Sequence, residues 1–400
     1  MKKYIYVFLS MIVLLFGGMC YAWSVLSAPL AVEFATWSAA KLAITFTICM
    51  SSFCIGGFLT GLYGNRIKLP FVIILSGLMY FVGLHISSNT YESIVPLYLG
   101  FGILCGLATG IIYNITISTL VSWFPNNNGI ISGLLLMSFG FGSFVIGIVY
   151  QKLLSNGMEW RFIFENLGLA IFILFIIFAV VLRKPEVNHK ETDERSVPEN
   201  DIVYSDFTSK EMMKTKTFWL YFIWVFCIAF AGYVVLAHAS GILYEAVESI
   251  DAALATTIIG FVSIANGVGR TIFGCIYDRF GYKVTVLLIE VDFAVAIVSI
   301  FSALLFKNLI LVGIGFLCGG LYLAGAASMN STFISDYYGK KFYAANFAIV
   351  NLNVLISSYG STVAGVVYDQ TGSYIYITGV LCLLLLISTI CAFLIKRPVK

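Results

Sequence analysis

The sequence predicts an all-α membrane protein with twelve transmembrane helices arranged as two six-helix pseudo-repeats. Of its 400 residues, 60% are hydrophobic and only 11% are charged, whereas soluble domains carry about 25% charged residues. Apolar segments of about 20 residues, the length that crosses a bilayer as a helix, recur along the whole chain. A single long polar segment divides them into two groups of six.

The expected spans follow from these apolar segments. In the first half they are 5–28, 39–62, 69–87, 93–120, 129–150 and 160–182. In the second half they are 217–244, 252–275, 283–306, 308–332, 343–367 and 373–395. The segment between them is rich in charge and poor in aromatic residues, which favours a solvated linker. The expected domains are therefore residues 1–182, a cytoplasmic linker at 183–216, and residues 217–400.

The positions of Lys and Arg predict the orientation of the chain. If both termini are inside the cell, 18 of the 23 Lys and Arg residues lie on the inner side and four on the outer side. Cytoplasmic loops carry such an excess of basic residues. We therefore expect a multi-pass protein of the plasma membrane with both termini cytoplasmic.

Short motifs recur between the two halves. Gly61, Asn65 and Arg66 after the second span match Gly274, Asp278 and Arg279 after the eighth, a shift of 213 residues. The tetrapeptide 147–150 (GIVY) similarly matches 365–368 (GVVY). Parallel repeats around a binding site at the membrane midplane are the architecture of alternating-access transporters.

Arg270 is the candidate centre of the site. It is the only Lys or Arg that the predicted topology does not place near a membrane surface. A cation at that depth costs about 2.5–3.5 kcal/mol on insertion scales and marks a functional site by default. Asn266 precedes it by four residues and shares its helix face. The alternative is an arginine that extends along the helix to the cytoplasmic surface.

Other polar residues inside the spans are candidate walls of the same cavity. The substrate-binding candidates besides Arg270 and Asn266 are Tyr21, Tyr113, Tyr233, Tyr322 and Asn353. Each of them alone is more often a contact between helices. His238, inside the seventh span, titrates near neutral pH in its unperturbed form and is a candidate coupling residue. Its alternative role is that of a packed, hydrogen-bonded histidine.

Glu290 and Asp292 are acidic residues in the ninth span, at about the depth of Arg270. One of them could neutralise Arg270 in the empty protein or carry a coupled proton. The alternative is that both face lipid headgroups or the cytoplasmic funnel and take no part.

The residues from Gly274 to Lys283 resemble the loop signature of the major facilitator superfamily, with Asp278, Arg279, Gly281 and Lys283 at its key positions. Longer stretches at 21–30, 123–145, 160–164, 218–240 and 265–281 resemble its oxalate/formate antiporter family. The monocarboxylate transporter family is the nearest competitor. The resemblance implies the superfamily's fold, an alternating-access mechanism in which the loop residues control conformation, and an anion ligand at Arg270.

The chain departs from the family pattern at two places. In the first-half loop, Asn65 and Arg66 stand without the acidic residue of the signature. The family's oxalate exchanger places a Lys on the eleventh helix, whereas no Lys occurs here between Lys341 and Lys396 and Val354 aligns with that position. The resemblance therefore implies an anion site with one fixed positive charge.

We interpret the chain as a secondary transporter of small carboxylates, in particular monocarboxylates, and expect antiport. The alternatives are a proton-coupled monocarboxylate symporter and, from a different class, a membrane sensor that binds a carboxylate. The monocarboxylate symporters that this chain resembles carry an Asp at the position of Asn266. No enzyme activity is expected, because the inner loops contain no clustered His, Cys or Asp. No metal or cofactor is expected, since the nine cysteines lie singly without metal-ligand spacing, and no nucleic acid, since the distribution of charge follows the membrane topology. The expected partners are the lipid bilayer and a small carboxylate anion, bound by a monomer.

Overall fold

The computed structural model describes residues 2–63, 67–124, 128–183, 206–247, 249–339 and 341–398. The first-half loop motif at Asn65 and Arg66, and most of the linker predicted at 183–216, lie outside the described residues.

The first half of the chain forms six spans. Its helices are α1 (Lys2–Gly17), the 3₁₀ turn η1 (Gly18–Ala22), α2 (Trp23–Leu26), α3 (Ala28–Glu33), α4 (Ala39–Tyr63), α5 (Leu69–Ser88), α6 (Val95–Leu97), the π-helical η2 (Tyr98–Cys105), α7 (Gly106–Trp123), α8 (Asn128–Ser155) and α9 (Trp160–Val181). The first span runs from α1 to α3 and the fourth from α6 to α7.

The second half begins with a short helix and continues with the remaining spans. Its helices are α10 (Ser209–Lys214), α11 (Lys216–Ala246), α12 (Ala252–Phe306), α13 (Leu309–Tyr338), α14 (Tyr343–Asn351), α15 (Asn353–Ser357), α16 (Tyr359–Thr371) and α17 (Ile375–Leu394). The eleventh span runs from α14 to α16 and, like the first, consists of several shorter helices.

Helix α12 contains two spans, which accounts for the twelve. Eleven described helices are long and apolar enough to cross a membrane, and α12 is one of them with 55 residues. A helix of that length would measure about 80 Å, against a hydrocarbon core of about 30 Å. Gly281 interrupts it with non-helical angles, φ 73° and ψ −174°. This backbone region is almost exclusive to glycine, so the predicted spans 252–275 and 283–306 are joined there.

Several spans expected to be continuous helices are broken, and the breaks bear on the site. The first span changes to a 3₁₀ turn at Gly18, where the backbone of α8 approaches so closely that a Cβ on Gly18 would lie only 3.1 Å from the Cα of Gly142. Tyr21 lies on this turn. Irregular backbone at membrane depth is tolerated where it lines a cavity or is buried in protein.

Glycines set the close helix contacts. Gly260, Gly267 and Gly274 recur every seven residues in the sequence, which predicts a helix face that another helix can approach closely. Gly260 does pack on the ring of Phe144, and Gly267 lies against the backbone of Gly140. Small residues at such positions let two backbones approach within a membrane. The third glycine predicted on that face, Gly274, differs, because a Cβ added there would meet no atom within 4 Å among the described residues.

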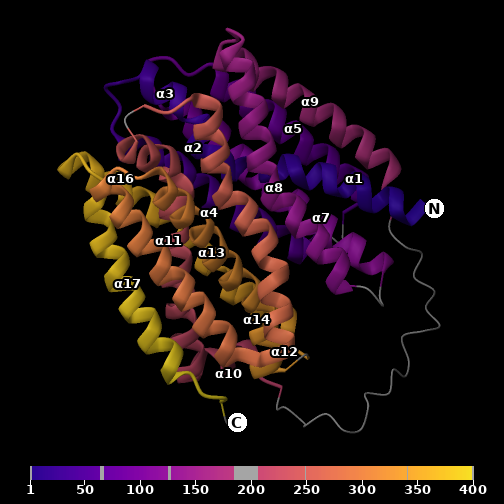
Figure 1. The fold of residues 1–400 in the computed structure, drawn as a ribbon. Helices are drawn as coiled ribbons and strands as arrows, with labels where there is room; N and C mark the ends of the chain where they lie inside the picture. The colour runs from indigo at the N-terminus through magenta and orange to yellow at the C-terminus, as the bar shows by residue number, and fades with distance from the viewer. Residues whose placement is uncertain are drawn as a thin grey trace.

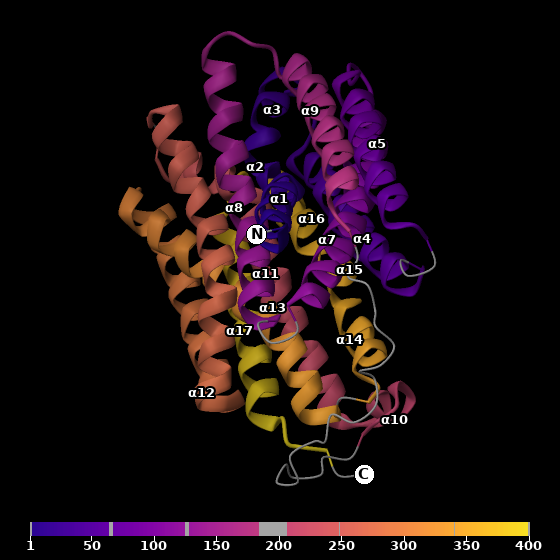
Figure 2. The same cartoon turned by 90° about the vertical axis from the view of Figure 1, so that its right-hand side faces the viewer.

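The two groups of helices converge at one end and diverge at the other (Figure 1), and the view turned by 90° shows α8 running beside α12 (Figure 2). We call the end that holds Glu33, Ala39 and Thr371 the distal end, and the end that holds Lys3 and Leu394 the terminal end. At the distal end the groups meet along two pairs of helices, α4 with α16 and α8 with α12. Toward the terminal end, α1 to α9 and α11 to α17 point away from each other (Figure 1).

The division of the chain at residues 182 and 217 stays a prediction, because the segment that contains both boundaries is largely outside the described residues.

Candidate functional site

Arg270 lies on α12 where the two groups of helices meet. Its side chain is half-buried. The Nε atom donates to the Oδ1 of Asn266 at 3.2 Å, one turn earlier on the same helix. The Nη1 atom lies 3.4 Å from the hydroxyl of Tyr113, which belongs to α7 in the other group. The guanidinium therefore contacts both groups at once.

Aromatic side chains surround this guanidinium. The hydroxyls of Tyr21 and Tyr233 lie close enough for electrostatic contact with Arg270. Tyr21 and Tyr113 both pack edge-on against Phe139, with ring centroids 5.3 and 5.0 Å apart. Three of the four predicted tyrosines are thus brought near the arginine by three different helical segments.

No carboxylate pairs with Arg270 among the residues that the structure describes. An arginine carries five N–H donors in a planar fork. The carbonyl of Asn266 and the hydroxyls of Tyr113 and Tyr21 can accept three of them. The cation therefore keeps donors for a ligand, and its charge is balanced only by the dipoles of neutral groups.

The contact with Arg270 fixes the orientation of the Asn266 amide. Because arginine has only donors, the amide oxygen must be the atom that accepts from it, and the Nδ2 group forms no bond with the arginine. Asn266 is 0% exposed, and its Nδ2 has no hydrogen-bond partner among the described residues. A buried donor without a partner costs about 1–3 kcal/mol. An acceptor that reached both this amide and the guanidinium would remove that cost.

Two of the predicted binding residues lie away from Arg270. The Tyr322 ring packs on Phe293, at 4.8 Å between centroids, on the part of α12 that follows Gly281. Asn353 donates from Nδ2 to the carbonyl of Phe222 on α11 at 3.0 Å. These contacts match the alternative role of helix packing.

Glu290 is bound to other helices and not to Arg270. It is 7% exposed. Its carboxyl accepts hydrogen bonds from Trp224 Nε1 on α11 at 2.7 Å and from two hydroxyls on α17, those of Ser388 and Thr389, each at 2.9 Å. It therefore ties together three helices of the second half.

Asp292 is half-buried, and its electrostatic neighbour is Cys318 of α13. No contact joins Asp292 or Glu290 to Arg270 among the described residues. The geometry therefore does not support the hypothesis that either acid neutralises Arg270 directly.

His238 is a fully hydrogen-bonded packing residue in this conformation. Its Nε2 donates to the carbonyl of Ser361 at 2.7 Å, and its Nδ1 lies 2.9 Å from the hydroxyl of Tyr374. Because Nε2 must carry the proton, Nδ1 of the neutral ring accepts from Tyr374. The ring therefore holds α16 next to the beginning of α17.

The loop residues Asp278, Arg279 and Lys283 are exposed around the turn at Gly281. Arg279 stacks on Phe280, with 5.3 Å between the guanidinium carbon and the ring centroid. Asp278 forms no ion pair within the described parts of the chain.

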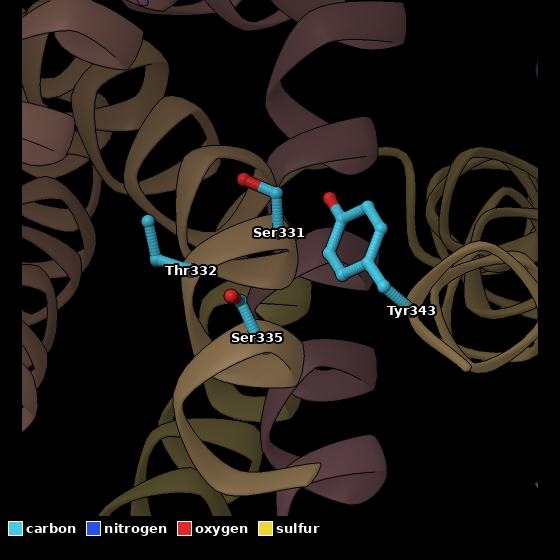
Figure 3. Close-up of a pocket in the computed structure, with 4 residues that line it drawn as sticks. All are labelled: Ser331, Thr332, Ser335 and Tyr343. Carbon is cyan, nitrogen blue, oxygen red and sulfur yellow. The ribbon is translucent and has the colours of Figure 1, made fainter. Parts of the chain in front are cut away.

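A pocket of about 390 Å³ opens near the terminal end of α13, where hydroxyl groups of Ser331, Ser335 and Tyr343 border it (Figure 3). Arg270 is not among the residues that line it, so the pocket is separate from the arginine. These residues carry no distinct signal in the sequence, because serines that bond back to their own helix are common. Phe139 likewise cannot be found from the sequence, since its role appears only when three helices meet.

Comparisons with known proteins agree with this architecture. The family model described as Major Facilitator Superfamily matches residues 7–358. The chain is 25% identical over 344 residues to the uncharacterized MFS-type transporter YhjX of Escherichia coli (strain K12), covering 85% of this chain and 82% of the relative. It is 26% identical over 291 residues to the oxalate:formate antiporter of Oxalobacter formigenes, covering 70% and 65%.

A solved structure shows the same fold. A bacterial homolog of the human lysosomal transporter Spinster, in an inward-facing and unoccupied conformation, is similar with a TM-score of 0.71. The likeness covers 98% of this chain and 96% of that one at 13% identity.

We predict that Glu290→Gln lowers the thermal unfolding temperature of the purified protein. The amide would place a donor against the donors of Trp224, Ser388 and Thr389, and one hydrogen bond to a carboxylate is worth about 1.5–3 kcal/mol. Asp292→Asn is the matched control, because it removes a carboxylate without a hydrogen-bond partner among the described residues. Equal unfolding temperatures for the two variants would contradict the assignment of Glu290 as a structural tie.

Proposed function

Because the chain belongs to the major facilitator superfamily and is a membrane transporter, we propose that it moves small monocarboxylates by alternating access around Arg270. The observation that carries the proposal is the position of this cation. It contacts both groups of helices, keeps unused donors and lacks a carboxylate partner among the described residues.

The chemistry of the guanidinium supports a carboxylate. Its planar fork can hold two carboxylate oxygens at once, and it stays protonated in a cavity. The unpartnered Nδ2 of Asn266 adds a neutral donor beside it. Three tyrosines provide further hydroxyls and apolar ring edges, which suit the small body of a monocarboxylate.

The number of fixed charges supports one carboxylate and not two. The eleventh span contains Asn353 and Val354 and no Lys. A second ionised carboxylate would stay uncompensated in a poorly solvated cavity, which costs several kcal/mol. Each 1.4 kcal/mol corresponds to a tenfold change in affinity.

We propose exchange of one anion for another as the mode of transport. A relative is named as an oxalate:formate antiporter, and formate is a monocarboxylate. Asn266 cannot carry a proton, and His238 and Glu290 are held by hydrogen bonds away from Arg270. If the halves can change conformation only while an anion is bound, each anion carried in one direction must be followed by another carried back, and transport is an exchange.

We further propose that the terminal end faces the cytoplasm of the cell, which makes this conformation inward-facing and closed on the outside. The excess of Lys and Arg on that side supports the orientation. Asn156, in the turn between α8 and α9 at the distal end, should therefore be labelled as Asn156→Cys by an impermeant reagent in intact cells. Lys396→Cys should be protected, and labelling of only the latter would reverse the orientation.

We predict that oxalate competes poorly with monocarboxylates. In liposomes that hold the purified protein and exchange labelled formate or pyruvate, unlabelled oxalate should inhibit at least a hundredfold more weakly than the best monocarboxylate, because its second charge lacks a partner. Acetamide, which has a similar size and no charge, is the control for non-specific inhibition. Oxalate that inhibits as well as the monocarboxylates would refute the charge balance.

A further inference from the structure

The distal contact between α4 and α16 contains a charged element that the proposed anion site does not use. The Asp369 carboxylate, near the end of α16, accepts hydrogen bonds from the backbone N–H groups of Ala39 at 2.7 Å and Ala40 at 3.0 Å. These are the first two residues of α4. One carboxylate thus binds the beginning of a helix from the opposite half of the molecule.

The first four N–H groups of α4 all have hydrogen-bond acceptors only because Asp369 supplies two of them. A helix leaves its first four N–H groups without partners in the helix. Ser38 serves the two inner ones, because its side chain accepts from Lys41 and its carbonyl accepts from Leu42. The two outer ones, on Ala39 and Ala40, depend on Asp369.

The backbone of α16 comes close enough for this contact because of Gly365. A Cβ on Gly365 would lie 2.6 Å from the nitrogen of Ala40, a distance that real side chains do not show. Asp369 follows one turn later and therefore reaches the helix start. Further along the contact, the Thr47 hydroxyl donates to the carbonyl of Ser358 at 3.0 Å and lies 2.8 Å from the hydroxyl of Ser361.

The pseudo-repeat provides a comparison within the chain. The equivalent of α4 in the second half is the first part of α12, and its own Asp251 caps it, with Oδ2 accepting from Ala253 at 3.0 Å and Leu254 at 3.1 Å. The match of 147–150 with 365–368 puts Gln151 at the position of Asp369. One helix is capped locally and the other across the two halves.

We propose that Asp369 is a positioning residue for transport, which caps α4 from the opposite half and thereby favours the conformation closed at the distal end. The cap exists only while α4 and α16 are together. Separation of the halves at the distal end removes it, and water must then replace the carboxylate at Ala39 and Ala40. The Asp369 cap therefore stabilises only the conformation that is closed at the distal end. The Asp251 cap lies within one half and stabilises the closed and the open conformations equally.

The proposal rests on the proposed alternating access, and its test needs no substrate. Spin labels on Asn156 and Phe306, which are exposed at the distal ends of the two halves, report the opening as a distance in the purified protein. The labels are attached in a background whose native cysteines have been replaced. Asp369→Ala removes both acceptors, Asp369→Asn keeps one, and Asp251→Ala is the matched control within one half.

Asp369→Ala should raise the ratio of distally open to closed molecules about tenfold, which corresponds to a cap of about 1.4 kcal/mol. Asp369→Asn should give a smaller rise, and Asp251→Ala should leave the ratio within about twofold. An unchanged ratio in both Asp369 variants, or an equal shift in Asp251→Ala, would overturn the proposal. If the Asp369 variants shift the ratio of open to closed molecules but the protein exchanges no carboxylate, the proposal for the cap stands and the proposed substrate is refuted.

Discussion

The proposed mechanism depends on a single electrostatic constraint. The positive charge of Arg270, which pairs with no carboxylate among the described residues, lies between two groups of helices that this mechanism requires to separate. A charge in a medium of low dielectric constant is stable only with a partner. The surrounding groups are dipoles, the amide of Asn266 and the hydroxyls of Tyr113 and Tyr21. These dipoles lower the free-energy cost of the charge and leave donors of the guanidinium available for the anion that we propose as its ligand. A permanent carboxylate partner would occupy the site.

The contacts between the two groups of helices are made by small residues and single hydrogen bonds, which fits the reversible separation that we propose. They consist of glycine contacts, hydroxyl pairs such as Ser143 with Ser263, and the cap at Asp369. Small residues give tight packing without deep interlocking of side chains, which would let the helices separate without unfolding in the proposed mechanism. The firm contacts lie within the halves, for example between Arg161 and Glu33 at 2.6 Å and around Glu290.

Much of this could be predicted from the sequence, because it follows from composition and periodicity. The twelve spans and the depth of Arg270 follow from apolar length alone, and the packing of Gly260 and Gly267 from their seven-residue spacing. Helical spacing also placed Asn266 beside Arg270. The spacing of residues shows which of them share a face of one helix. It does not show which neighbouring helix that face contacts.

The roles of the other candidate residues depend on which neighbouring helix they contact, and the sequence does not show this. Tyr322, Asn353 and His238 are polar residues in spans like Tyr113, but their helices turn them toward Phe293, Phe222 and Ser361. Asp369 lies in a polar stretch at the end of a span, where an acid carries no signal. Its role depends on a helix start 330 residues earlier in the chain.

The central claim is that Arg270 neutralises the transported carboxylate, and uptake by Arg270 variants in liposomes tests it most directly. Breaking a buried ion pair costs about 3–5 kcal/mol, which is at least a hundredfold in affinity. Arg270→Gln should therefore abolish uptake of labelled formate and pyruvate, and Arg270→Lys should keep part of it, since it retains the charge and loses the planar fork. Uptake at the wild-type rate by a correctly inserted Arg270→Gln protein would contradict the account.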